Sequence, residues 1–290
     1  MPVYDQGYQP YDGPRRPLTH RWLPLWREEV APYARKRAFL LLIVLALLPW
    51  LILGAGLTFL HTQIGDASWA QELVKQLPPM DEAWVAKLLT NYWNSFLLII
   101  VCIWVGSGLV ARDRKERTLE VFLGRALGPR QYLWAKGAAL GSYLLLFTFV
   151  PTVVLVIFHV GLSGDTPFLW QHSRVLWGSL LYTVLGPGTL VLVVMALSSL
   201  SRSPRVVGLA LVGAAFFGPP AAGILFLITK SPLSWTLAVL VELQALGYHC
   251  LGADPPAEIS APHAAIYFVL LAVGSLVVLW LRFKDREVLR

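Results

Sequence analysis

The sequence predicts an all-α polytopic membrane protein with six transmembrane helices. Only 14% of the 290 residues are charged, whereas a soluble protein carries about 25%. Six uncharged runs of 23 to 28 residues divide the chain, at 38–65, 88–111, 137–164, 175–201, 206–229 and 259–281. About 20 apolar residues suffice to cross the hydrocarbon core. Each run must be helical, because lipid offers no hydrogen-bond partner for the backbone.

The basic residues predict the orientation of these spans. Of the 24 Lys and Arg residues, 20 lie before the first run, at 112–136, at 202–205 or after the last run. This bias places both termini and the 112–136 loop in the cytoplasm. The net charge of +7 is therefore a topology signal. No nucleic-acid partner is expected, although the composition does not exclude RNA on the basic loop.

The chain before the first span divides into two parts. Residues 1–19 lack an apolar period and predict a disordered cytoplasmic tail. Residues 20–37 predict an interfacial helix on membrane lipid, with the charges of Arg21, Arg27, Glu28 and Glu29 largely facing away. The alternative is a basic flank that only fixes topology. The apolar side of this helix holds Trp22, Leu25 and Trp26.

Several of the predicted spans contain prolines. Pro49 is expected to kink the first span. Pro187 and Pro219 interrupt the fourth and fifth, where they mark either a translocation path or gate, or simple packing kinks. The spans are predicted at about 38–60, 91–111, 137–160, 175–199, 206–229 and 263–281, within a transmembrane domain of 38–281 followed by a cytoplasmic tail at 282–290.

Two external segments are expected between the spans. Residues 61–90 show two short amphipathic patterns separated by Pro78-Pro79, which predicts short helices over the outer surface. Residues 231–250 have an apolar core too short to cross, so they predict a re-entrant or surface helix before the last span. Glu242 interrupts that core. It is expected to face water, with a role at an exit gate as the alternative.

The loop at 112–136 predicts a short amphipathic helix. Thr118 is a suitable cap, and Leu119, Phe122 and Leu123 follow at the spacing of one helix face. Gly128 ends this helix, and Pro129 is a good first residue for the next one. The alternative is a turn that packs on its own helices or rests on lipid headgroups.

The same loop resembles the loop between spans two and three of ABC-2-type permeases, the membrane subunits of many ATP-binding-cassette transporters. It departs from the family with Arg117 where glycine is usual, Ala126 where proline is usual, and Asp113 where glutamate is common. The residues that match are Glu116, Thr118, Leu119, Leu123, Arg130 and Lys136.

The resemblance implies a function and a set of partners. The loop would be the coupling helix that docks on a separate ABC ATPase subunit, which would bind ATP and Mg²⁺, so this chain would need no cofactor and no catalytic residue. The permease would act as a homodimer or with a second permease, most often as an exporter in the bacterial cytoplasmic membrane. The implied coupling residues are Asp113, Glu116, Thr118, Leu119, Glu120, Phe122, Leu123 and Arg125.

Two absences in the sequence agree with an external energy source. The chain has no G-x-x-x-x-G-K-[ST] motif for binding phosphates. No Asp, Glu, Lys or Arg falls inside a predicted span, whereas ion-driven carriers use ionisable groups within the membrane.

Three rival interpretations remain open. Ser163, within Gly161-Leu162-Ser163-Gly164, and His263 match the dyad of rhomboid-like intramembrane proteases, although small residues in a loop also make a simple turn. A membrane anchor that uses a partner ATPase for mechanical signalling is the second. A metal site is the third, but the spacing of its candidates matches no common site. Those candidates are His159, His172, His249, Cys250 and His263.

Overall fold

The computed structural model describes residues 22–59, 81–118, 128–163 and 168–284. The predicted N-terminal tail, the first of the two amphipathic patterns expected at 61–90 and the predicted coupling helix at 119–127 lie outside these residues. The second amphipathic pattern forms a short helix, Glu82–Leu89, as expected. Every regular element in the described part is helical. The elements are α1 (Trp22–Ala34), α2 (Arg37–Pro49), η2 (Trp50–Ala55), α3 (Gly56–Phe59), α5 (Glu82–Leu89), α6 (Tyr92–Trp104), η4 (Gly106–Gly108), α7 (Ala111–Lys115), α9 (Pro129–Ser163), α10 (Phe168–Gln171), α11 (Ser173–Leu200), α12 (Pro204–Thr229), η5 (Pro232–Leu237), α13 (Val239–Leu251) and α14 (Ala261–Lys284).

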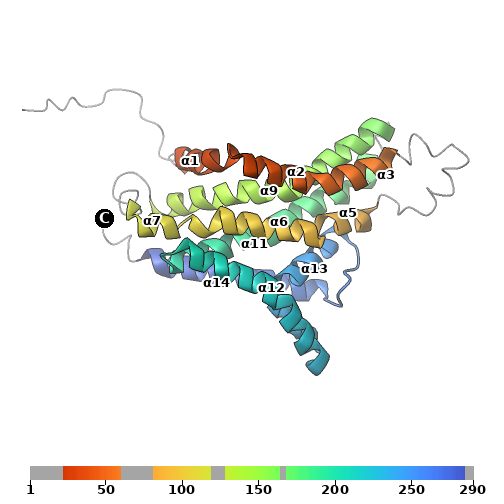
Figure 1. The fold of residues 1–290 in the computed structure, drawn as a ribbon. Helices are drawn as coiled ribbons and strands as arrows, with labels where there is room; N and C mark the ends of the chain where they lie inside the picture. The colour runs from red at the N-terminus through yellow and green to blue at the C-terminus, as the bar shows by residue number, and fades with distance from the viewer. Residues whose placement is uncertain (1–21, 60–80, 119–127, 164–167, 285–290) are drawn as a thin grey trace, which may run out of the picture.

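The all-helical membrane class is confirmed. Five stretches among the described residues are long and apolar enough to cross a membrane: Tyr92–Lys115, Pro129–Gly161, Ser173–Leu200, Pro204–Thr229 and Ala261–Lys284. They run roughly alongside one another (Figure 1). We call the end where α7 stops and α9 begins the loop end, and the opposite end, where α5 and α13 lie, the α13 end.

The predicted first span is a broken helix. Its apolar helical part, Arg37–Ile52, is shorter than the five spans, so a sixth crossing stays a prediction. α2 stops at Pro49 and continues without a gap into the π-helix η2 and then α3. Pro49 lacks the N–H that would bond to the carbonyl of Leu45. That carbonyl accepts the indole N–H of Trp93 on α6, at 2.9 Å.

A second break lies between α6 and α7. An added Cβ on Gly106 would lie 2.5 Å from Val194 of α11, so glycine permits close contact there. The break frees backbone groups, and the hydroxyl of Ser198 on α11 bonds to three of them. It accepts the N–H of Val110 at 3.0 Å and of Ala111 at 2.9 Å, and donates to the carbonyl of Ser107 at 3.1 Å.

The long helices extend past several predicted ends. α9 begins at Pro129, which confirms the predicted start of that helix but lies well before the predicted span at 137. α6 and α7 likewise carry the second span to Lys115. Asp113 and Lys136 therefore lie inside helices at the loop end, although the sequence placed both outside the spans.

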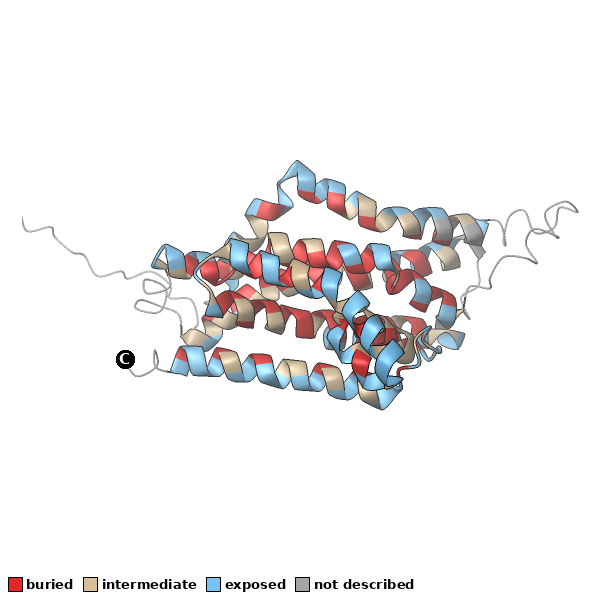
Figure 2. Ribbon diagram, turned by 60° about the horizontal axis from the view of Figure 1, so that its bottom comes forward, coloured by how far each residue is buried: buried red, intermediate tan, exposed pale blue. Residues whose placement is uncertain are grey.

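The core is built around the inner helices. α6 and α11 bury most of their side chains, whereas α12 and α14 expose most of theirs, and Figure 2 shows this contrast between central and outer helices. α12 contains Pro219 and Pro220 and bends, so that its second half leaves the bundle (Figure 1). η5 packs on this half, with the rings of Phe226 and Trp235 5.4 Å apart.

α13 is folded into the bundle and does not lie on its surface. Glu242, Leu243, Ala245, Leu246 and Gly247 are all buried. The prediction that Glu242 faces water is therefore wrong, because its first helical turn is enclosed by neighbouring helices. That α13 is re-entrant in the membrane stays a prediction. α13 ends at Leu251 and is capped by Gly252, whose φ of 81° is a conformation that favours glycine.

Candidate functional site

The loop end holds α1 against the bundle. Trp26 donates its indole N–H to the hydroxyl of Ser142 on α9, at 3.1 Å. Tyr143 of α9 donates to the carbonyl of Val30, at 2.6 Å. Leu25 is buried, and Trp22 packs against the core. The apolar side of α1 predicted for lipid therefore contacts protein.

A buried charge cluster joins α1, α7 and α9. Lys136 of α9 is 2% exposed, and its Nζ lies 2.5 Å from Oε1 of Glu29 and 2.8 Å from Oδ2 of Asp113. The hydroxyl of Tyr132, one turn earlier on α9, donates to the same Oδ2 at 2.7 Å. The prediction that Glu29 faces away from the membrane side of α1 is wrong, because its carboxylate neutralises Lys136.

The cluster brackets the segment predicted to contact a partner. Asp113 lies six residues before Leu119, and Lys136 lies nine residues after the end of the 119–127 segment. Removing one member of a buried ion pair leaves the other charge unpaired, at a cost of about 3–5 kcal/mol. The helices on either side of the segment, α7 and α9, are thus joined to each other and to α1 by this cluster.

The predicted coupling residues have different environments. Asp113 is buried within this chain, whereas Glu116 is exposed. The hydroxyl of Thr118 lies 3.4 Å from the carbonyl of Asp113, to which it donates. Arg117 has a φ of 58°, a left-handed conformation that glycine adopts at no steric cost. Leu119, Glu120, Phe122, Leu123 and Arg125 lie outside the described residues.

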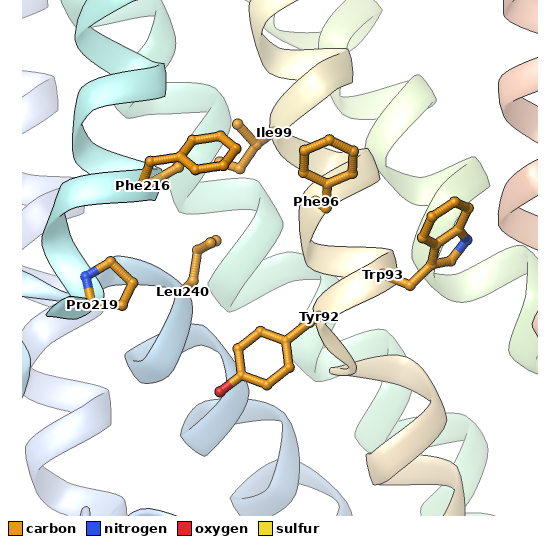
Figure 3. Close-up of a pocket in the computed structure, with 8 residues that line it drawn as sticks. Tyr92, Trp93, Phe96, Ile99, Phe216, Pro219 and Leu240 are labelled. Atoms are coloured by element: carbon orange, nitrogen blue, oxygen red, sulfur yellow. The ribbon is translucent and has the colours of Figure 1, made fainter.

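An apolar groove opens between α6 and α12 toward the α13 end. It encloses about 400 Å³. Phe96 of α6 and Phe216 of α12 meet edge to face across it, with ring centroids 6.3 Å apart (Figure 3). Ligand pockets of about 300–1,000 Å³ with apolar, aromatic linings are typical of small-molecule sites. The lining is completed by Tyr92, Trp93, Ile99, Ala215, Pro219 and Leu240.

The three residues predicted for a path or gate are dispersed. Pro219 lines the groove, at the bend of α12. Pro187 is buried inside α11, which runs past it without a break. Glu242 is buried on α13, and its Oε1 lies 2.9 Å from Nε2 of His263.

The histidines at the α13 end have separate partners. Nδ1 of His172 lies 3.0 Å from Oε1 of Glu82, and Nε2 of His249 lies 2.7 Å from the carbonyl of Ile259. Within the described ranges, no three His, Cys, Asp or Glu residues gather as a metal site would need. Nε2 of His263, the base of the rival protease interpretation, is engaged by Glu242.

The charge cluster was missed because its members lie far apart in sequence. Two local signals pointed toward it. Tyr132 and Lys136 are four residues apart and so share a face of α9. Glu29 follows Leu25 by four residues and Trp26 by three, which places it on the buried face of α1.

Comparison with known proteins adds no assignment. No protein-family model matches the chain, and no curated protein matches it significantly.

Proposed function

We propose that this chain is the membrane-spanning permease subunit of an ABC-2-type transporter, driven by a separate ATPase subunit. The observation that carries the proposal is the buried pairing of Asp113 with Lys136, which joins the two helices that flank the 119–127 segment. A segment that receives force from a partner must be fixed to the helices it moves. This cluster supplies that connection, and α1 is tied into it through Glu29.

The backbone at Arg117 gives independent support. ABC-2-type permeases usually have glycine at the matching position, and here the residue has a left-handed φ of 58°. An L-residue pays about 1–2 kcal/mol for this conformation. The turn thus keeps a geometry suited to glycine, although the sequence departs from the family at this position.

In the proposed mechanism, the partner binds ATP and Mg²⁺, and its closure pushes the amphipathic helix formed by Leu119, Phe122 and Leu123. Glu116, Glu120 and Arg125 would fix the register of the contact. The charge cluster then moves α7 and α9 together with α1. Because α6 and α7 belong to the same span, Tyr92–Lys115, the movement would reach the wall of the apolar groove.

The apolar lining of the groove supports the proposal of an apolar substrate, or of a substrate with an apolar part. Its aromatic lining offers a large contact surface and few polar groups, so it would select for hydrophobicity more than for a particular headgroup. The bend of α12 at Pro219 would let one wall move. We propose export from the cytoplasm of a bacterium, by a dimer of this chain or by its complex with a second permease.

Co-purification tests the proposal. The tagged chain, purified from membranes of its native host, should retain a P-loop ATPase. Phe122→Asp should lose that ATPase, because a carboxylate would enter an apolar contact. Leu200→Asp is the matched control, since Leu200 is exposed at the end of α11 on the loop end. Equal ATPase retention by both variants would contradict the coupling assignment.

A further inference from the structure

The carboxyl group of Glu242 occupies an apolar site between α13 and α14. The residue has no exposed surface, and its neighbour Leu243 is equally buried. Oε1 lies 2.9 Å from Nε2 of His263, whereas Oε2 is enclosed and has no hydrogen-bond partner among the described residues. A buried carboxylate is normally stabilised by several donors. Here the carboxyl group of Glu242 has one hydrogen-bond partner among the described residues, His263.

The helix itself does not stabilise a charge on Glu242. The residue lies in the first turn of α13, where free N–H groups often bind carboxylates. No such N–H donates to it in the described part of the chain. Burial therefore raises the pKa of Glu242, an effect that the nearby His263 only partly offsets.

The other ionisable groups around α13 do not change the direction of the pKa shift of Glu242. From α14, Tyr267 also interacts with Glu242. α11 brings Tyr182 beside Gly247 and Arg174 beside Gly252, both toward the later turns of α13. On α5, Glu82 pairs with His172 and Lys87 is exposed. The one charged residue of α12, Arg205, lies at the loop end of that helix.

We propose that Glu242 and His263 form a proton-binding site, in which protonated Glu242 donates a hydrogen bond from its carboxyl group to Nε2 of His263. The proton lies between Oε1 and Nε2, and Oε2 is then the carbonyl oxygen of a neutral acid. A proton is the ligand that fits, because Glu242 is fully enclosed and a larger ligand would displace packed side chains. His263 is 17% exposed and links the site to the aqueous phase at the α13 end.

The bound proton stabilises the packing of α13 against α11. Added Cβ atoms on Gly178 and Gly186 of α11 would lie 2.6 Å and 2.5 Å from Cys250 and Leu243, so α13 fits closely and has little room to adjust. Loss of the proton would leave a charge in this contact. Because the pKa of Glu242 is raised in the folded state, its contribution to stability is fully present at low pH and is lost as pH rises through that pKa.

Infrared spectroscopy tests the protonation state directly. The reconstituted wild type at pH 7 should show the carbonyl stretch of a protonated carboxyl group, and Glu242→Gln should lose it. Glu258→Gln, which removes an exposed acid at the same end of the bundle, should keep it. A wild-type spectrum with no band that depends on Glu242 would overturn the proposal.

Thermal unfolding gives a second readout. Raising the pH from about 5.5 to 8 should lower the Tm of the wild type relative to Glu242→Gln, and Glu258→Gln should follow the wild type. Parallel Tm curves for the wild type and Glu242→Gln would overturn the stabilising role. Should Glu242→Gln fail to fold, wild type labelled with ¹³C at its glutamate carboxyl carbons replaces it. A glutamic-acid band persisting at pH 7 supports the site, and its absence contradicts it.

Discussion

The indole N–H of Trp93 donates to the carbonyl of Leu45, the group that Pro49 leaves without its usual helical partner. This bond ties the broken first helix to α6 beside the groove. An unsatisfied backbone carbonyl costs about 1–3 kcal/mol, and lipid offers no water to replace the lost donor.

Trp93→Phe should therefore destabilise the protein by about 1–2 kcal/mol, since it removes the donor and keeps an aromatic ring. Pro49→Ala should reduce this cost, because an alanine at this position supplies a backbone N–H for the carbonyl of Leu45. Thermal unfolding of the two single variants and the double variant measures the coupling. Strictly additive effects would show that Trp93 and Pro49 do not act on the same carbonyl.

Lys136→Met should destabilise the fold by about 3–5 kcal/mol, because it leaves Glu29 and Asp113 facing each other without a cation. Lys115→Met, at an exposed lysine of α7, is the control and should change stability by less than about 0.5 kcal/mol. Denaturant unfolding in detergent compares them. Equal stability of the two variants would contradict a structural role for the cluster.

Ser198→Ala should cost about 1–3 kcal/mol, since the N–H groups of Val110 and Ala111 would lose their acceptor inside the bundle. Ser199→Ala is a matched control, because the Ser199 hydroxyl bonds to the carbonyl of Ala196 within its own helix. Hydrogen exchange at residues 110 and 111 should rise in the first variant alone. Unchanged exchange there would show that Ser198 does not secure the break.

Gly178→Ala should destabilise by about 1–3 kcal/mol, because the new Cβ would lie 2.6 Å from the backbone carbonyl oxygen of Cys250. Gly141→Ala, on α9, meets no atom within 4 Å and should instead stabilise by up to about 1 kcal/mol through helix propensity. The Tm values of the two variants should move in opposite directions. An unchanged Tm for Gly178→Ala would show that α13 packs less tightly against α11 than the structure indicates.

Local patterns in the sequence predicted the helical class and the start of α9, because hydrophobic length and the position of Pro129 act within one segment. They missed the pairing of Glu29 with Lys136 and the burial of Glu242, which depend on how distant helices meet. From its own segment alone, an acidic residue such as Glu242 is predicted at the surface, because the helices that enclose it come from distant parts of the chain. A π-helix follows Pro49, where the sequence predicted a kink. The bond between the Leu45 carbonyl and Trp93 likewise depends on a neighbouring helix.

The central claim is that energy enters through the segment between Asp113 and Lys136, from the cytoplasm. Its most direct test is labelling of Phe122→Cys with a membrane-impermeant thiol reagent, in a background with Cys102→Ala and Cys250→Ala. Residue 122 should be labelled in opened cells and not in intact cells, whereas the control Glu258→Cys, exposed at the α13 end, should be labelled in intact cells. Labelling of residue 122 in intact cells would contradict a cytoplasmic coupling helix.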